Sequence, residues 1–185
     1  MNLDFRMHAE RTPNPESIKW VLSTEVVPVG ETASFQAPVG PDLSPLAARL
    51  FAVEGVEAVF LASHFVTVTK REDLAWTDLA EAVVGAIKAH VSSGEPGLGA
   101  AFEAESLGPV GTVEARIQQI LEDEIRPAVA MDGGDVVFAG FHDGVVEVML
   151  QGSCAGCPSS TATLRFGIEA RLRDAIPEVT RVVQI

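Results

Sequence analysis

The chain has 185 residues, with 26 acidic and 13 basic side chains and a formal net charge of −13. A surface this acidic repels phosphate backbones and anionic lipid headgroups, so it disfavours binding to nucleic acid and to membrane surfaces. Hydrophobic residues make up 47% and charged residues 21%, as in a folded protein with a packed core. No apolar stretch approaches the length of about 20 residues that a transmembrane helix needs. No targeting segment is visible at the N-terminus, so we expect a cytoplasmic protein.

The first half of the chain has the pattern of a small α+β domain. Short apolar runs rich in β-branched residues predict strands over residues 17–22, 56–61 and 65–70, the last two as a hairpin. Apolar residues at helical spacing predict helices over 44–53 and 76–91. In the second helix Leu79, Val83 and Ile87 recur every four residues, which indicates a side facing the core rather than a cofactor site.

The composition changes once, over residues 92–111. This stretch is rich in Gly, Pro, Ser and Glu and has no apolar period, as in a flexible linker. The alternative is a long surface loop within one domain, but structureless loops of this length are uncommon. We therefore predict two small domains, residues 1–91 and 112–185, joined by a linker over 92–111.

The second half predicts five elements in the order α-β-β-α-β, over residues 112–125, 136–141, 145–150, 159–175 and 179–185. Pro127 should end or kink the first helix, because proline lacks the N–H that a helix interior uses. Asp143-Gly144 lies between the first two strands and is a strong signal for a hairpin. We therefore predict an α+β fold in which this domain has a three-stranded sheet.

The only two cysteines, Cys154 and Cys157, form a CxxC motif where a strand gives way to a helix. Thiolates in this position face unpaired N–H groups and the positive end of the helix dipole. Both effects favour the thiolate, which is the metal ligand and the nucleophile. Gly152 and Gly156 allow the backbone to turn tightly and to approach a bound anion. The motif is therefore predicted to hold negative charge.

Four interpretations of this motif remain open: an incidental pair, a thioredoxin-like redox pair, a structural zinc site and an iron–sulfur cluster site. The absence of flanking aromatic residues and the α-β-β-α-β order disfavour the redox pair. Zinc and an iron–sulfur cluster each require four ligands, and the chain has neither a second CxxC nor an HxxxH motif. If a metal binds, a second chain or an outside thiol must complete the site. A homodimer with facing CxxC motifs supplies four thiolates on its two-fold axis, and a cluster shared in this way suits a carrier.

Two segments, residues 131–136 and 150–160, resemble the C-terminal domain of the NifU and Nfu iron–sulfur cluster scaffold and carrier proteins. The similarity rests on the helix end Ile125-Arg126-Pro127, on the Gly-Gly-Asp entry to the hairpin, and on the pattern G-x-C-x-x-C-P-x-S. The first half resembles the N-terminal domain that accompanies it in Nfu proteins, through residues 12–15, 17–21, 50–51, 55–56 and 65–70. Together these similarities cover nearly the whole chain except the linker.

The resemblance implies a homodimer that binds a 4Fe–4S cluster between two CxxC pairs and passes it to apo-proteins, with an upstream cluster-assembly scaffold as donor. By matching position, Cys154 and Cys157 would be the cluster and metal ligands. The resemblance, not the spacing, selects 4Fe–4S over 2Fe–2S. No catalytic residues are expected. The alternatives are a thiol–disulfide oxidoreductase that uses the same pair and an adaptor that docks clients through its first half.

Two further motifs have two interpretations each. Residues 12–15, Thr-Pro-Asn-Pro, form either a rigid turn or a contact site for partners. In residues 131–135, Gly133 and Gly134 serve a backbone turn, while Asp132 and Asp135 cap local N–H groups. The alternative for this second motif is a direct contact to the cluster or to a client.

Overall fold

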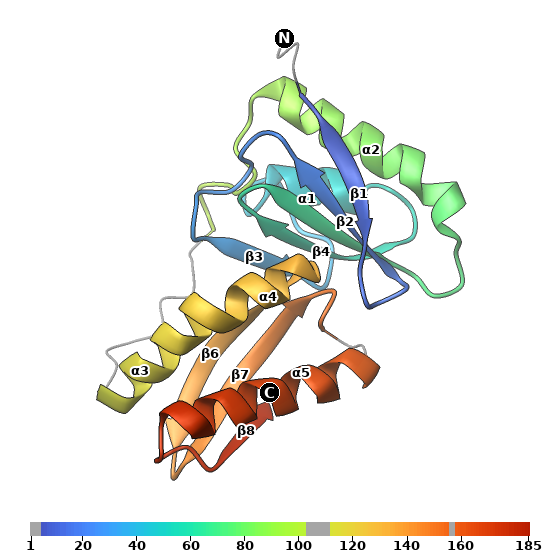
Figure 1. Cartoon of the computed structure of the whole chain (residues 1–185). Helices are drawn as coiled ribbons and strands as arrows, with labels where there is room; N and C mark the ends of the chain where they lie inside the picture. The colour runs from blue at the N-terminus through green and yellow to red at the C-terminus, as the bar shows by residue number, and fades with distance from the viewer. Residues whose placement is uncertain (1–4, 103–111, 156–157) are drawn as a thin grey trace. The chain divides into compact units, whose positions relative to one another are not determined.

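A computed structural model describes residues 5–102, 112–155 and 158–185, and for Thr112 and residues 158–161 it describes the backbone only. The chain divides into two compact units, Met1–Ala104 and Glu105–Ile185. Each unit has helices and a sheet of its own (Figure 1), which confirms the predicted α+β fold class. Among the helices described, none is both long enough and apolar enough to cross a bilayer.

The first unit is built on an antiparallel five-stranded sheet in the order β1-β2-β5-β4-β3. Its strands are β1 (Met7–Arg11), β2 (Ser17–Leu22), β3 (Thr32–Phe35), β4 (Val56–Ala62) and β5 (Phe65–Lys70). The predicted strands β2, β4 and β5 form its centre. The two edge strands, β1 and β3, were not predicted, because an edge strand of four or five residues carries little apolar alternation.

Two helices, α1 (Pro45–Phe51) and α2 (Trp76–Ser93), complete this unit, and both were predicted. Ser44 begins α1: its hydroxyl accepts a hydrogen bond from the Ala47 N–H at 3.0 Å. Apolar side chains of both helices pack against one face of the sheet in a single core that includes Trp20, Leu46, Leu50, Val66, Val83 and Ile87.

The first part of the predicted linker belongs to the first unit. Ser92 and Ser93 are the last residues of α2. Beyond them, the Gly97 N–H donates to the Val26 carbonyl at 3.0 Å, and the Phe102 ring meets Phe35 edge to face at 6.3 Å. These contacts hold residues that a flexible linker would leave free. The prediction is therefore wrong for residues 92–102, and residues 103–111 lie outside the described part of the chain.

The second unit has a three-stranded sheet in the order β6-β7-β8, made of β6 (Gly134–His142), β7 (Val145–Gly152) and β8 (Arg181–Gln184). β6 and β7 are antiparallel, whereas β7 and β8 are parallel. At the hairpin Asp143 and Gly144 have φ angles of 50° and 81°, as a type I′ turn requires, which confirms the Asp-Gly signal. Helix α5 (Pro158–Ala175) makes the crossover to β8.

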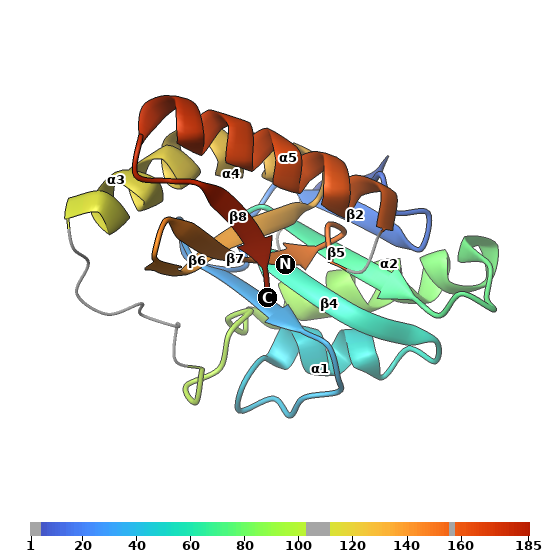
Figure 2. The same cartoon turned by 90° about the horizontal axis from the view of Figure 1, so that it is seen from below.

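The helical segment before β6 does not end before Pro127. It comprises α3 (Thr112–Ile120), a π-helical turn (Leu121–Ile125) and α4 (Arg126–Met131). Pro127 lies in the first turn of α4, where a missing N–H costs little. The wider π turn directly before it takes up the change of hydrogen-bond register. Figure 2 shows α3, α4 and α5 on the same side of the sheet. The core of this unit includes Ile117, Val129, Ile168 and Leu172 of these helices and Leu121 of the π turn.

Candidate functional site

Cys154 lies in the turn between β7 and α5, at the strand-to-helix junction that the sequence predicts. Its exposed fraction is only 3%, and its side chain belongs to the core cluster of the second unit. The second predicted ligand, Cys157, lies outside the described residues. The structure therefore places one of the two predicted site residues, and their assignment as ligands stays a prediction.

The turn that carries Cys154 is attached to residues 132–133, about twenty residues earlier in the chain. The Ser153 N–H donates to the Gly133 carbonyl at 3.2 Å, and the Ser153 hydroxyl donates to the Asp132 carbonyl. Gly133 and Gly152 have φ angles of 80° and 68°, which favour glycine. Asp132 and Gly133 thus supply the carbonyl acceptors that fix the cysteine turn.

The Cys154 sulfur occupies the space that a side chain at Gly134 would fill. A Cβ atom at Gly134 would come within 2.8 Å of the Cys154 Sγ and 2.5 Å of the Gln151 carbonyl oxygen. Gly134 also pairs with Gly152 across the β6–β7 ladder. Only glycine leaves room for the thiol at this position, so the sulfur rests on bare backbone.

Asp135 anchors the same segment from the other side. Both of its carboxylate oxygens accept hydrogen bonds from Arg126 of α4, at 2.8 and 2.7 Å, and Oδ1 also accepts the Val136 N–H at 2.7 Å. This hydrogen-bonded carboxylate raises the pKa of Arg126. The pair ties α4 to the start of β6 and so fixes the residues on which Cys154 rests.

These contacts agree with the interpretation of residues 131–135 as a backbone support in which Asp135 caps a local N–H. Sequence reasoning missed the two residues that complete the support, Arg126 and Ser153. Their partners lie nine and twenty or more residues away. No local pattern in the sequence links residues at such separations. Three or more His, Cys, Asp or Glu side chains do not gather into a metal-binding group anywhere among the described residues.

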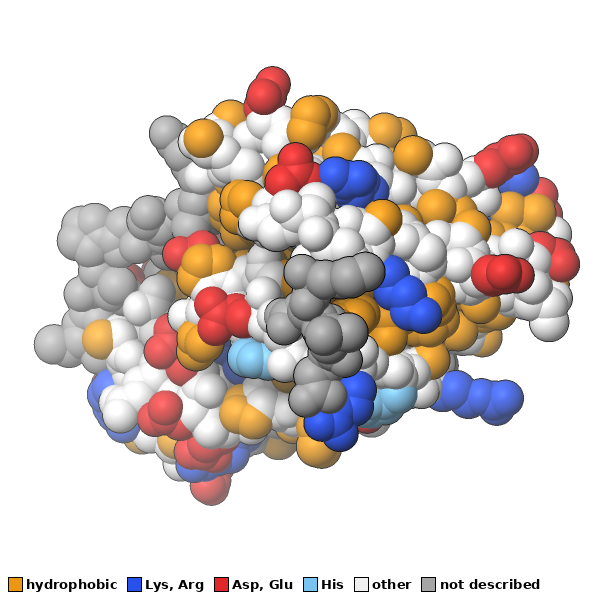
Figure 3. Space-filling view, turned by 90° about the horizontal axis from the view of Figure 1, so that it is seen from above, with side chains coloured by type: hydrophobic (Ala, Val, Ile, Leu, Met, Phe, Trp, Pro, Cys, Tyr) orange, Lys and Arg blue, Asp and Glu red, His pale blue; other side chains and the backbone are white. Residues whose placement is uncertain are grey.

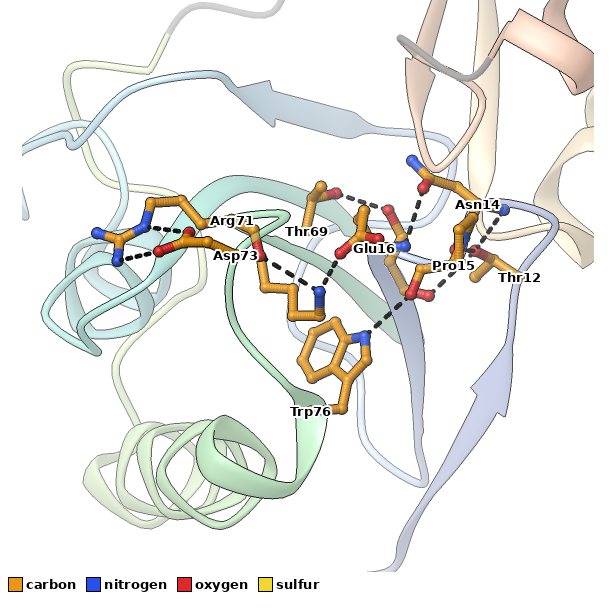
Figure 4. Close-up of polar contacts among 10 residues, drawn as sticks. Thr12, Asn14, Pro15, Glu16, Thr69, Arg71, Asp73 and Trp76 are labelled. Carbon is orange, nitrogen blue, oxygen red and sulfur yellow. Dashed lines mark hydrogen bonds and ion pairs between the residues drawn. The ribbon is translucent and has the colours of Figure 1, made fainter.

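In the first unit, residues 12–17 form a closed turn, as the first interpretation of Thr-Pro-Asn-Pro predicts (Figure 4). The Thr12 hydroxyl lies 2.8 Å from the Asn14 carbonyl oxygen and 3.1 Å from that of Ser17. The Asn14 side-chain oxygen accepts the Glu16 N–H at 3.0 Å, and the Trp76 Nε1–H donates to the Pro15 carbonyl at 3.3 Å. The turn is thus closed by hydrogen bonds within the unit.

The fold and the cysteine turn define a class: a two-unit α+β protein whose second unit presents a thiol between a strand and a crossover helix. Comparison with known families gives two matches, to the NifU-like domain over residues 117–183 and to the Nfu/NifU scaffold protein N-terminal domain over residues 7–94.

Several relatives match across both units, and two serve as examples. The human protein named "NFU1 iron-sulfur cluster scaffold homolog, mitochondrial" is 40% identical over 185 residues, covering 97% of this chain and 71% of its own length. The protein of the same name from Drosophila persimilis is 40% identical over 182 residues, covering 97% of this chain and 64% of its own. The chain thus spans slightly less than two thirds of that relative. The chain belongs to the Nfu/NifU family, as the motif resemblance predicts.

A solved structure was also found, the solution structure of a NifU-like protein from Saccharomyces cerevisiae. It is 19% identical and covers 53% of this chain and 89% of its own, with a TM-score of 0.44. One prediction is overturned by the comparisons. The expected cytoplasmic location is wrong, because the relatives that match the whole chain are named as mitochondrial proteins.

Proposed function

We propose that this protein is an iron–sulfur cluster carrier without catalytic turnover, and that a 4Fe–4S cluster is its cargo. Cys154 and Cys157 of two copies hold the cluster between them. The proposal is supported by family membership and by relatives named as iron–sulfur cluster scaffolds. The observation that carries it is the cysteine count: both cysteines of the chain lie in one CxxC motif.

The cysteine count sets the stoichiometry of the proposed complex. A cluster of this kind takes four thiolate ligands, and one chain offers two. Two copies related by a two-fold axis supply four equivalent ligands. The cluster then lies at an interface, where a loosened contact or a competing thiol releases it.

The surroundings of Cys154 favour this role. The N-terminus of α5 follows the motif, and its N–H groups and dipole stabilise thiolates. Cys154 itself is buried, so binding a cluster at the protein surface requires its turn to open. Hydrogen bonds from Ser153 to two carbonyl groups hold this turn, so its opening requires both to break.

Transfer is a ligand exchange at iron. A client thiolate replaces Cys154 or Cys157: its sulfur forms one Fe–S bond as another breaks, and the displaced cysteine leaves as a thiolate with no change of oxidation state. The proposed partners are apo iron–sulfur proteins as clients, an upstream cluster-assembly scaffold as donor, and a second copy of this chain.

Anaerobic reconstitution with iron, sulfide and a thiol tests the proposal. We expect a brown dimer with four iron and four sulfide ions, identified by native mass spectrometry and by its visible spectrum. Cys154→Ser and Cys157→Ser should each lose the cluster while the circular dichroism spectrum is unchanged. A full cluster on either variant would contradict the ligand assignment. A colourless monomer that reduces insulin disulfides would instead identify a thiol–disulfide oxidoreductase.

A further inference from the structure

A groove in the first unit, far in sequence from the cysteines, has the features of a binding site. It has a volume of about 730 Å³ and lies between β1, β2 and α2. Its walls are mainly apolar and include Phe5, Met7, Trp20, Leu22 and Val84 of α2. In the space-filling view from above, hydrophobic surface lies beside Lys, Arg and His side chains (Figure 3).

The charge of this groove is the opposite of the charge of the chain. Arg6 and Lys88 line it, and none of the eleven described residues that line it is acidic. This contrasts with residues 1–100, in which acidic residues outnumber basic ones by 13 to 7. Among the described acids the nearest in sequence is Glu10, whose carboxylate lies 3.2 Å from the Lys19 Nζ and 3.1 Å from the His8 Nε2. The groove therefore favours an anionic ligand with an apolar body.

Trp20 adds a buried donor to this groove. Its exposed fraction is 5%, and its indole Nε1–H has no hydrogen-bond partner among the described residues. A buried N–H without a partner is destabilising, and a ligand group that accepts its hydrogen bond would remove that cost. The other tryptophan, Trp76, already donates to the Pro15 carbonyl.

The backbone of β1 indicates which kind of ligand fits. β1 is an edge strand of the sheet, paired only with β2 in the described part of the chain. The Ser23 N–H donates to the Arg6 carbonyl at 2.9 Å, so Arg6 directs its backbone groups toward β2. Because this direction alternates along an antiparallel strand, the N–H and C=O groups of Met7 and Ala9 point to the open edge. The Met7 and Ala9 side chains share a face with their cross-strand partners Leu22 and Trp20.

We infer that this groove binds an extended acidic segment of another protein, which adds a strand to the β1 edge. Alternate apolar side chains of the segment enter the groove beside Met7 and Val84. Its carboxylates then lie on the other face of the added strand, as Arg6 does just before β1, and the nearby charge of Lys88 adds to their attraction. Strand addition of this kind draws affinity from main-chain hydrogen bonds and specificity from alternate side-chain pockets. This inference needs neither cysteine and stands apart from the cluster proposal.

Synthetic peptides test this inference on the full apo-protein. The probe is a fluorescein-labelled seven-residue peptide that alternates Glu and Leu, and its control alternates Lys and Leu. We expect fluorescence anisotropy to show binding of the Glu-Leu peptide at least about tenfold tighter than that of the control, because the groove is cationic. In ¹⁵N–¹H spectra the peptide should shift the Trp20 indole signal and leave that of Trp76 in place.

Matched variants locate the site. Lys88→Glu should lower the affinity for the Glu-Leu peptide at least about tenfold. Arg181→Glu makes the same charge change at an exposed position of β8 in the other unit and should not weaken peptide binding comparably. If both variants lose the same affinity for the peptide, the groove is not the binding site, and the net charge of the chain explains the effect.

Strand addition is tested by one change in the protein and one in the peptide. Ala9→Pro removes an N–H that faces the open edge, and a peptide N-methylated at alternate residues removes the matching donors of the probe. Each should abolish binding, and the N-methylated peptide needs no variant to fold. Unchanged binding in the N-methylated peptide would overturn strand addition. If octanoate alone shifts the Trp20 signal and competes with the peptide, the groove binds small molecules. That result would contradict the inference that its ligand is a segment of another protein.

Discussion

The Cys154 sulfur lies against the backbone of Gly134, so close that a Cβ atom at Gly134 would be 2.8 Å from it. Real Cβ contacts essentially never fall below 3.0 Å. The residue at position 134 therefore controls where the thiol lies, although it is twenty residues away in sequence. This relationship connects the Gly-Gly-Asp motif to the cysteine motif by a physical contact.

Gly134→Ala should destabilise the second unit and displace Cys154. The added methyl group meets the Gln151 carbonyl at 2.5 Å, and backbone atoms cannot yield as a flexible side chain can. Overpacking of this kind costs about 1–3 kcal/mol. Urea unfolding followed by circular dichroism measures the cost, and iron content after reconstitution measures the loss of cluster.

Gly85→Ala is the matched control for this substitution. Gly85 lies within α2, and a Cβ there meets nothing within 4 Å. Its replacement should stabilise the chain by about 0.5–1 kcal/mol, because glycine is a poor helix former. Iron content should be unaffected. Equal destabilisation by both substitutions would contradict the packing explanation.

Asp135→Ala should destabilise the second unit by about 3 kcal/mol, because it leaves the Arg126 guanidinium half-buried without its two-oxygen partner. Asp135 also accepts the Val136 N–H, so Asp135→Asn should cost less, since an amide oxygen can still accept it. Glu124→Ala breaks the exposed Glu124–Arg171 pair instead and should change the unfolding midpoint little. If Glu124→Ala lowers the free energy of unfolding as much as Asp135→Ala does, burial of the ion pair does not determine its contribution to stability.

His90 should make the first unit less stable as the pH falls. Its exposed fraction is 1%, and neither ring nitrogen has a hydrogen-bond partner in the described structure. Burial lowers the pKa of His90 below its ordinary value of 6.5, and the nearby Arg49 lowers it further, against a smaller opposing effect of Glu95. The unfolded chain therefore takes up a proton first, so stability is full above pH 6.5 and declines as the pH falls from 6.5 toward the lowered pKa.

The fluorescence of the two tryptophans measures this effect, since Trp20 and Trp76 both belong to the first unit. Urea unfolding should show a lower midpoint at pH 5.5 than at pH 7.5. His90→Leu should lose most of that difference, because leucine has no proton to gain. If the leucine variant keeps the full pH dependence, other groups are responsible.

Thr12→Val should destabilise the first unit by about 1 kcal/mol. Valine keeps the shape of threonine but removes the hydroxyl that closes the turn onto the carbonyls of Asn14 and Ser17. Thr77→Val is the control, because the Thr77 hydroxyl makes only an exposed contact of 3.4 Å to the neighbouring Asp78. Thermal unfolding monitored by tryptophan fluorescence compares the two, and equal effects would contradict a structural role of the turn.

Cys154 should react slowly with iodoacetamide in the apo-protein. In a Cys157→Ser variant it is the only thiol, and with 3% of its surface exposed it should be alkylated at least about tenfold more slowly in buffer than in urea. Mass spectrometry measures both rates. Equal rates would mean that the turn is open in solution before any cluster binds.

Local chemistry in the sequence determined much of this protein. Helical spacing of Leu79, Val83 and Ile87 predicted α2, Asp143-Gly144 predicted the β6–β7 hairpin, and the CxxC motif predicted a thiol between a strand and a helix. These features depend on residues within one or two turns of each other, so periodicity and turn preferences are sufficient to find them.

Only the tertiary structure decided the features that depend on distant residues. The edge strand β1 exists because β2 pairs with it, and the groove beside it exists because α2 packs across the same face. The bonds from Ser153 to residues 132–133 and from Arg126 to Asp135 join segments whose proximity follows from strand register and helix packing. Composition showed an acidic chain, but only folding gathers cations around an apolar groove.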